Sequence, residues 1–433
     1  FYQPILDASS QEACLADISR IATDISRYAS VFLEGESLEL YCKGDSAPWE
    51  MPIVIAAQKT LKEWLTNVVG LSPHDSEALA ERFPFYFNYE LFSLSGNPPF
   101  NRIAHFFRIG MNHKTWCYNA ARLMKEVSEG MLDEAFSIRE IHIPPSCYFV
   151  QKNGKARIYT VRDLKKRLLS WLALPTPSRR VQIINGGPRS GKSSFATLLA
   201  ADVAKEGKIP TILIPLMSFN LKKPIKQAIK EYVSEHSRLS HTAIDTCHNQ
   251  CEVGNDDFES YVRMHERLLL IFDGLDELSE TDSTTTDLAE SFLLSLDKVL
   301  SELSGSKTVQ AIVTGRAIAV NALQANKKLT LLDDQILHLL QFNNENWHDE
   351  LSFGDKFSDP EKLRFKDLRT EWWQKYQKLI GKTEEYPKEL SEGRLGELSE
   401  QPLLLYLIAS NYDNQSMVSS RHISTIYRSL FNK

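Results

Sequence analysis

The apolar positions of the chain fall into two patterns, short continuous runs and helical repeats. Three runs, at residues 181–184, 268–272 and 308–313, have the length and composition of strands that are buried on both faces. Helical patterns occupy residues 194–200 and about 225–235. Buried strands that alternate with helices build a doubly wound parallel sheet, so we predict an α/β fold for the middle of the chain.

The first part of the chain shows a different pattern. Residues 11–31 and 53–69 carry helical periodicity, and residues 83–89 form an aromatic cluster that we expect to pack in a core. This region contains acids and a lysine at Glu34, Glu36, Glu39 and Lys43, but their spacing does not match the acid-x-Lys pattern of nuclease sites. No nucleophile with an adjacent base occurs there either. We therefore predict a mainly helical N-terminal domain without recognisable chemistry.

Composition limits the possible classes of protein. A chain of 433 residues is longer than a single hydrophobic core usually accommodates, so two or three domains are expected, and 42% hydrophobic residues are enough to form their cores. The net charge of −6 gives no argument for binding nucleic acid or membrane, and no apolar run is long enough to span a bilayer. No signal peptide precedes the first helical pattern, and six scattered cysteines suit a reducing cytoplasm. Because the chain opens on Phe1 and closes within a helical pattern, we expect it to be a portion of something longer.

The strongest chemical signal is a glycine-rich segment between the first strand and the following helix. Its pattern, G-x-x-x-x-G-K-S, is that of a phosphate-binding loop, in which backbone N–H groups and the positive end of a helix face the phosphates. We expect Lys192 to supply charge to the phosphates and Ser193 to offer a hydroxyl to Mg²⁺. The predicted nucleotide-binding residues of this segment are Gly186, Gly187, Pro188, Arg189, Ser190, Gly191, Lys192, Ser193 and Ser194.

Acidic residues follow the second strand. In a doubly wound sheet the carboxyl ends of the strands face the ligand crevice, so Asp273 is predicted to approach the Mg²⁺ ion held by Ser193. Asp276 and Glu277 come next, and we expect Glu277 to orient the attacking water, with Asp276 as the other candidate. The third strand ends near Arg316, whose fixed charge can distinguish a triphosphate from a diphosphate.

These motifs together resemble the NACHT domains of the STAND class of signalling ATPases, the NOD-like receptor type, with a bacterial or antiviral member expected. The similar segments are the acid motif of residues 273–278, the sensor motif of residues 313–316 and the proline motif of residues 401–406. Residues 209–216 resemble the strand after the phosphate-loop helix, residues 340–347 the start of the helical domain, and residues 423–428 the helix before a winged-helix domain. The resemblance covers about residues 145–433.

The resemblance implies roles for individual residues. Lys192 would bind the phosphates of ATP or ADP, Asp273 would bind Mg²⁺ through water, and Glu277 would position the attacking water. Arg316 would sense the γ-phosphate, and Pro402 would pack on the adenine. It also implies a trigger ligand, sensed by a region that would lie beyond this chain, and a homo-oligomer in the activated state.

Three domains and a linker are expected from these patterns. Residues 1–140 are an effector or adaptor-like domain, and residues 141–180 are a linker with a hairpin at Asn153–Gly154 and a helix, which the family resemblance places over the nucleotide. Residues 181–335 are the P-loop NTPase core. Residues 336–433 are a helical subdomain that leads toward a winged helix.

Two other clusters invite alternative readings. Basic residues dominate residues 152–192, but Arg162, Lys165, Lys166 and Arg167 fall in a helical pattern, so a solvated helix face is expected rather than a nucleic-acid site. The pair Cys247 and Cys251, with His241 upstream, lacks the partner motif of a zinc site, and a polar loop is expected.

Three functional classes follow. The first is an ATP-dependent switch of an innate-immunity or antiphage defence type, in which slow hydrolysis, nucleotide exchange and assembly activate the N-terminal domain. The second is a motor or remodelling ATPase that acts on protein or nucleic acid. The third is a small-molecule kinase, which would usually show an Arg-rich lid that this sequence lacks.

Overall fold

A computed structural model of the chain describes residues 52–93, 111–129, 136–153, 156–219, 223–237, 267–277, 285–304, 308–316, 333–344, 356–410 and 412. The chain divides into two compact units, Phe1–Lys125 and Glu126–Lys433. The predictions for residues 11–31, for the early acids and Lys43, for the cysteine pair with His241 and for residues 423–428 lie outside the described residues.

The described part of the first unit is helical, as expected. Its helices are α3 (Pro52–Asn67), α4 (Pro73–Ser93) and most of α6 (Met111–Ser128). The start of α4 is stabilised because the hydroxyl of Ser72 donates to the Asp75 carboxylate at 2.6 Å and accepts from the Asp75 backbone N–H at 3.1 Å. Within the predicted aromatic cluster, Phe85 is buried, which confirms part of that cluster as core.

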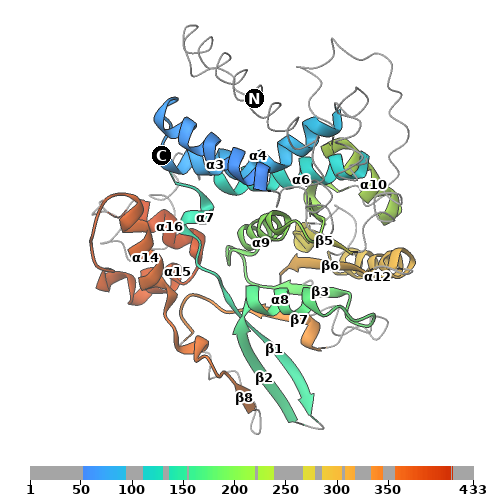
Figure 1. The fold of residues 1–433 in the computed structure, drawn as a ribbon. Coiled ribbons are helices and arrows are strands. Elements are labelled where there is room, and N and C mark those ends of the chain that lie inside the picture. Colours follow the sequence, from blue (N-terminus) through green and yellow to red (C-terminus); the bar gives the residue numbers. More distant parts are fainter. Residues whose placement is uncertain are drawn as a thin grey trace. The chain divides into compact units, whose positions relative to one another are not determined.

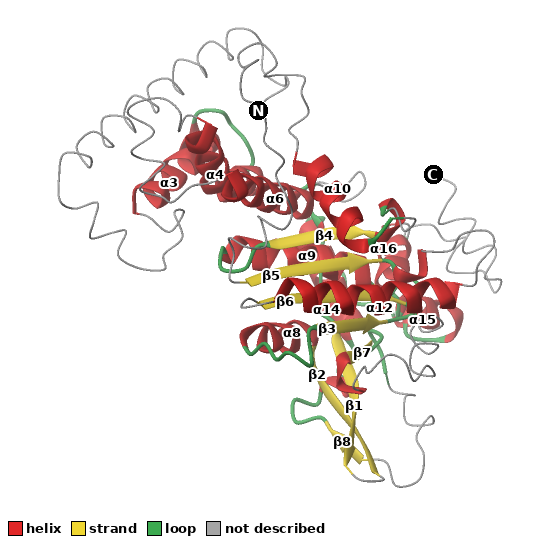
Figure 2. Cartoon of the chain, turned by 90° about the vertical axis from the view of Figure 1, so that its right-hand side faces the viewer, coloured by secondary structure: helices red, strands yellow, loops and turns green. Residues whose placement is uncertain are grey.

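The second unit is built on a sheet of eight described strands in the order β4-β5-β6-β3-β7-β1-β2-β8 (Figures 1 and 2). From β4 to β7 every neighbouring pair is parallel, which confirms the doubly wound parallel sheet predicted from the apolar runs. Beyond β7, strand β1 pairs antiparallel with both β7 and β2, and β2 pairs parallel with β8. The strands are β1 (Ser146–Asn153), β2 (Ala156–Asp163), β3 (Val181–Asn185), β4 (Thr211–Pro215), β5 (Arg267–Asp273), β6 (Thr308–Gly315), β7 (Ile336–Leu339) and β8 (Lys356–Ser358).

Helices cover both faces of this sheet, which explains why its central strands are continuous apolar runs. Helix α9 (Lys192–Glu206) lies behind the sheet in Figure 2, and α12 (Thr285–Ser304) lies in front of it. All five residues of β3 are buried. The ring of Phe272 packs edge-on against Phe292 of α12, with 5.3 Å between centroids. Burial of each such side chain contributes about 1.5–3 kcal/mol to stability. Helix α10 (Ile225–Ser237) and the short helices η2 (Leu216–Ser218), η3 (Leu275–Glu277) and η4 (Asp333–Gln335) complete this part.

The helices after β8 have a core of their own, shared with the segment before β1. The buried rings of Trp372 and Tyr376 stack with centroids 5.4 Å apart, and Phe136 packs edge-on against Tyr376 at 6.0 Å. Ile141 and Ile143 are buried in the same cluster. The linker is therefore part of the packing of the helical region. The elements are α7 (Ile138–Ile141), η6 (Leu363–Phe365), α14 (Leu368–Leu379), η7 (Lys388–Leu390), α15 (Gly393–Ser399) and α16 (Pro402–Ser410).

The predicted hairpin is confirmed, but the helix after it begins later than its pattern suggested. Asn153 pairs with Ala156, and the antiparallel ladder continues to Asp163, so Arg162 lies in a strand rather than in a helix. Helix α8 (Leu164–Ala173) begins where the Asp163 carboxylate accepts the Lys166 N–H at 2.7 Å. Pairing with β1 thus overrides the local helical period.

The expectation that Arg167 is solvated is also wrong. Its guanidinium lies over the ring of Phe149, 4.9 Å from the centroid, and donates to the carbonyl of Asp334 at 3.4 Å. A long cationic side chain can cover an aromatic ring while it reaches a carbonyl, so the residue packs against the hairpin.

Candidate functional site

The glycine-rich segment connects the end of β3 to the start of α9, as its sequence predicted. Arg189 (φ 60) and Gly191 (φ 81) both adopt the left-handed backbone conformation, and Gly191 precedes the first residue of α9. Left-handed residues within a turn let neighbouring backbone N–H groups converge on an anion, and the N-terminus of α9 adds its positive dipole. The segment therefore has the backbone of a phosphate-binding loop.

Lys192 is held inside this loop. Its side chain is only 9% exposed, and its ammonium group donates to the carbonyls of Gly186 at 2.9 Å and Gly187 at 2.8 Å. Burial lowers the pKa of Lys192, while the charges of Asp276, Asp273 and Glu277 oppose that shift. The structure thus brings the loop lysine and the predicted acids into one electrostatic environment.

Asp273 is positioned by a residue that the sequence analysis did not single out. The buried hydroxyl of Thr314, on β6, donates to Oδ1 of Asp273 at 2.5 Å and accepts the backbone N–H of Gly274 at 2.9 Å. A threonine near the end of a strand that lies beside the acid strand was the available signal. Strand order, which pairs β5 with β6, was needed to interpret it.

The other two acids lie on the short helix that follows β5. Asp276 forms an ion pair with Arg316, with 2.5 Å between Oδ2 and Nε. Glu277 is exposed, and desolvation followed by the charges of Asp273 and Asp276 raises its pKa. A carboxylate with a raised pKa suits a group that accepts a proton from water.

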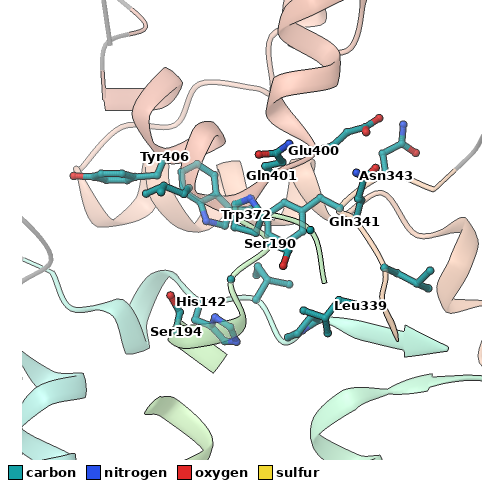
Figure 3. A pocket seen from close by; sticks show the side chains of 18 of the residues that line it. His142, Ser190, Ser194, Leu339, Gln341, Asn343, Trp372, Glu400, Gln401 and Tyr406 are labelled. Carbon is teal, nitrogen blue, oxygen red and sulfur yellow. The ribbon is translucent and has the colours of Figure 1, made fainter. Parts of the chain in front are cut away.

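A pocket of about 510 Å³ opens beside the phosphate loop. Gly187, Pro188, Ser190, Gly191 and Ser194 line it from the loop and the start of α9. The ring of Pro402 and the side chains of Trp372 and Gln401 come from the helical region. Figure 3 places Ser190 between these helical residues and Leu339 of β7. The pocket therefore joins the loop to the predicted adenine-side proline.

The linker lines the same pocket with residues that the sequence analysis did not name. Burial, followed by the charge of Lys375, lowers the pKa of His142 to about 4, so this ring is neutral near pH 7. The ring of Tyr148 stacks on His338 with centroids 4.7 Å apart. Nδ1 of His338 lies 2.8 Å from the amide nitrogen of Asn185. Burial lowers the pKa of His338 to about 4, so the neutral ring can accept this hydrogen bond just before the loop begins.

The predicted site residues therefore divide into two groups around the loop. One group, with Pro402, lines the pocket, and the other, with Asp273, Asp276, Glu277 and Arg316, surrounds Lys192. The side chains of Arg189 and Ser193 are exposed.

The donor set fits Mg²⁺. The Ser193 hydroxyl and the Asp273 carboxylate are oxygen donors, which Mg²⁺ prefers, and a nucleotide-bound Mg²⁺ ion needs only one or two protein ligands beside phosphate and water. Within the described part of the chain, no cluster of three or more His, Cys, Asp or Glu side chains could hold a metal ion by itself. Ser193 and Asp273 are therefore the residues that could hold a Mg²⁺ ion.

Comparison with known proteins identifies the central region. Residues 180–349 match the model of the NACHT domain, which is a P-loop NTPase domain. None of the curated proteins matches the chain. One similar solved structure is that of a DnaB-like replicative helicase, described with its interactions with primase. It shares 12% identity over 70% of this chain and 76% of that chain, with a TM-score of 0.24. None of the helices that the structure describes is long and apolar enough to cross a membrane.

Proposed function

We propose that this chain, whose residues 180–349 form a NACHT domain, is an ATP-dependent switch of an innate-immunity or antiphage defence type. In this proposal ADP holds the closed state, and sensing of a trigger ligand permits exchange for ATP with Mg²⁺. The ATP-bound state forms a homo-oligomer that activates the N-terminal domain. Hydrolysis is slow and resets the switch.

The observation that carries this proposal is the composition of the pocket. Three segments far apart in the sequence line it: the linker through His142, the phosphate loop through Ser190, and the helical region through Pro402. A nucleotide whose phosphates occupy the loop and whose base enters the pocket would contact all three segments. Because a ligand shifts a conformational equilibrium only through differential contacts, a site built from three segments is suited to control their arrangement.

Ion pairs and hydrogen bonds tie these segments together. Asp202 of α9 accepts Lys165 of α8, which belongs to the linker, at 2.6 Å and pairs with Arg139 of α7 at 3.2 Å. Lys375 of α14 donates to the carbonyl of His142 at 2.8 Å. A movement at the phosphate-loop helix would therefore reach the linker and the helical region through direct contacts.

The residues around Lys192 divide the reaction between them in this proposal. Lys192 and the loop N–H groups bind the phosphates, Ser193 and Asp273 hold Mg²⁺, and Glu277 orients the attacking water. The bound Mg²⁺ ion supplies charge neutralisation at the phosphates. Arg316 exchanges its partner Asp276 for the γ-phosphate, which makes the ion pair at 2.5 Å a reporter of which nucleotide is bound.

The domain assignment belongs to the same proposal. Residues 1–140 are the effector or adaptor-like part, residues 141–180 the linker over the nucleotide, residues 181–335 the NTPase core and residues 336–433 the helical subdomain. The trigger would be sensed outside these regions.

The test is to identify the nucleotide that co-purifies with the protein and to measure particle size and ATP turnover with and without added ATP. We expect retained ADP, turnover that is slow or stoichiometric, and larger particles with ATP when the trigger is present. Steady rapid turnover without retained ADP would instead indicate a motor or remodelling ATPase.

A further inference from the structure

Thr314 lies where the phosphate-loop strand and the acid strand share a neighbour. Strand β6 runs between β3 and β5, and Thr314 pairs with Ile184 of β3. On the other side Val313 pairs with Phe272, so Thr314 stands beside Asp273 at the carboxyl ends of both strands. The threonine side chain is fully buried.

The hydrogen-bond roles of this hydroxyl are determined by its partners. The backbone N–H of Gly274 can only donate, so the Thr314 oxygen accepts it at 2.9 Å. The single hydroxyl proton is then free to point at Oδ1 of Asp273, 2.5 Å away. An O–H group that donates to a carboxylate makes a short, charge-assisted hydrogen bond, which leaves Oδ2 of Asp273 as the oxygen that this hydroxyl does not occupy.

A Mg²⁺ site gains from a carboxylate that is oriented in advance. Mg²⁺ requires near-ideal octahedral geometry at short distances, so an acid that rotates about its side-chain bonds binds it less well than a fixed one. Residues that hydrogen-bond a metal-binding carboxylate supply this orientation in other sites, and their loss costs about 10–100-fold in metal affinity or activity.

We infer that Thr314 is a positioning residue that orients the Asp273 carboxylate toward the Mg²⁺ ion of a bound nucleotide. The inference rests on the proposed nucleotide-binding function. The backbone N–H of Gly274 holds the Thr314 hydroxyl oxygen in place, and the hydroxyl proton then points to the Asp273 carboxylate.

A purely structural role is the alternative, because the hydroxyl also satisfies a buried backbone N–H. The two roles predict different results for Mg²⁺. Loss of a structural contact would weaken nucleotide binding equally with and without the metal ion. Loss of orientation would weaken only the part of the affinity that Mg²⁺ contributes.

The experiment measures the affinity of the whole chain for a non-hydrolysable ATP analogue, in excess Mg²⁺ and in EDTA. For Thr314→Val, which keeps shape but removes the hydroxyl, the ratio of the two affinities should fall by about tenfold or more, with little change in EDTA. Thr314→Ser keeps the hydroxyl and should retain most of the wild-type ratio. Thr314→Ala, which also lacks the hydroxyl but is smaller, serves if the valine variant does not fold, and it should match the valine result.

An unchanged ratio in the valine or alanine variant, or an equal loss of affinity with and without Mg²⁺, overturns the inference. So does a serine variant that behaves like the valine variant. Failure of the proposed function looks different, because the wild-type chain itself would then not bind the ATP analogue in either condition. Adding Asp273→Asn should remove the effect of Thr314→Val, since the hydroxyl then has no carboxylate to orient.

Discussion

Arg316 and Asp276 form an ion pair that links the ends of two parallel strands, with 2.5 Å between Nε and Oδ2. Arg316 follows β6 and its side chain is 52% exposed, while Asp276 follows β5 and is only 14% exposed. The guanidinium therefore reaches from a solvated position to a more buried acid beside Lys192. Any anion that competes for Arg316, the γ-phosphate in particular, must replace this contact.

Arg316→Ala should bind ADP as wild type does but lose its preference for ATP. One charge-assisted contact contributes about 1.5–3 kcal/mol, so the ratio of ATP to ADP affinity should fall by roughly 10–100-fold. Calorimetric titration with each nucleotide measures the ratio, and particle size with trigger and ATP measures assembly. Asp276→Asn, which removes the competing charge, should change the ratio in the opposite direction. An alanine variant that discriminates and assembles as well as wild type would leave Arg316 without a sensing role.

Lys192→Ala should abolish retention of nucleotide during purification. The change removes the ammonium group held at the Gly186 and Gly187 carbonyls, and with it the cation inside the loop, so affinity should fall by about 100-fold or more. Lys205→Ala removes a lysine near the other end of the same helix and provides the control. Analysis of the nucleotide released by denaturation decides the matter, and equal retention in both variants would contradict the assignment.

Glu277→Gln should bind ATP normally and hydrolyse it at least about 100-fold more slowly, the scale for loss of a general base. Glu397→Gln, at an exposed position of α15, should hydrolyse at the wild-type rate. Turnover and ATP affinity measured on the same preparations separate chemistry from binding. Wild-type turnover in the Glu277 variant would move the role to Asp276.

The raised pKa of Glu277 also predicts a pH dependence. Because desolvation raises this pKa above its ordinary value of 4.5, the basic form should be lost as pH falls through a value above 4.5, and hydrolysis should decline there. Stability has the opposite pH dependence, because the ionised carboxylate that hydrolysis needs is the form that desolvation disfavours in the folded state. Above its raised pKa Glu277 is ionised and lowers the stability of the folded state, so Glu277→Gln should be no less stable than wild type at pH 7. A rate profile that stays flat down to pH 4.5, or a clear loss of stability in the variant, would contradict this electrostatic account.

Gly274→Ala should lower both stability and turnover. Gly274 has a φ of +92°, and an added Cβ would lie 2.6 Å from Oε2 of Glu277, so the catalytic candidate would have to move. A left-handed conformation at a non-glycine residue costs of order 1–3 kcal/mol. Gly381→Ala is the matched control, because it has a φ of +72° with no atom within 4 Å of the added Cβ. Both variants should unfold at a lower temperature, but only the first should lose turnover.

Much of the fold was predictable because its signals are local. The buried strands around Ile183, Ile271 and Ile312 are recognisable in the sequence as apolar runs, because helices cover both of their faces. The phosphate loop is equally local, because all the residues that form it lie in one short segment between a strand and a helix. Lys192 was therefore identified without any knowledge of its neighbours.

The extent of the hairpin and the packing on its surface could not be predicted from such local patterns. The helical period around Arg162 was overridden by pairing of β2 with β1, and the supposed solvated Arg167 packs on Phe149 from the same hairpin. The turn at residues 153–154 predicted the hairpin, but not how far its ladder extends or which side chains pack on it, and these two errors have that common cause.

The sequence by itself determined the parallel sheet, the loop that can bind phosphates and the acids at the end of the next apolar run, because each depends on residues that are close along the chain. Only the tertiary structure decided that Thr314 orients toward Asp273, that Arg316 pairs with Asp276, and that His142 shares a pocket with Pro402. Those relationships arise from strand order and from helices packed on a linker, and such packing is a property of the whole folded unit.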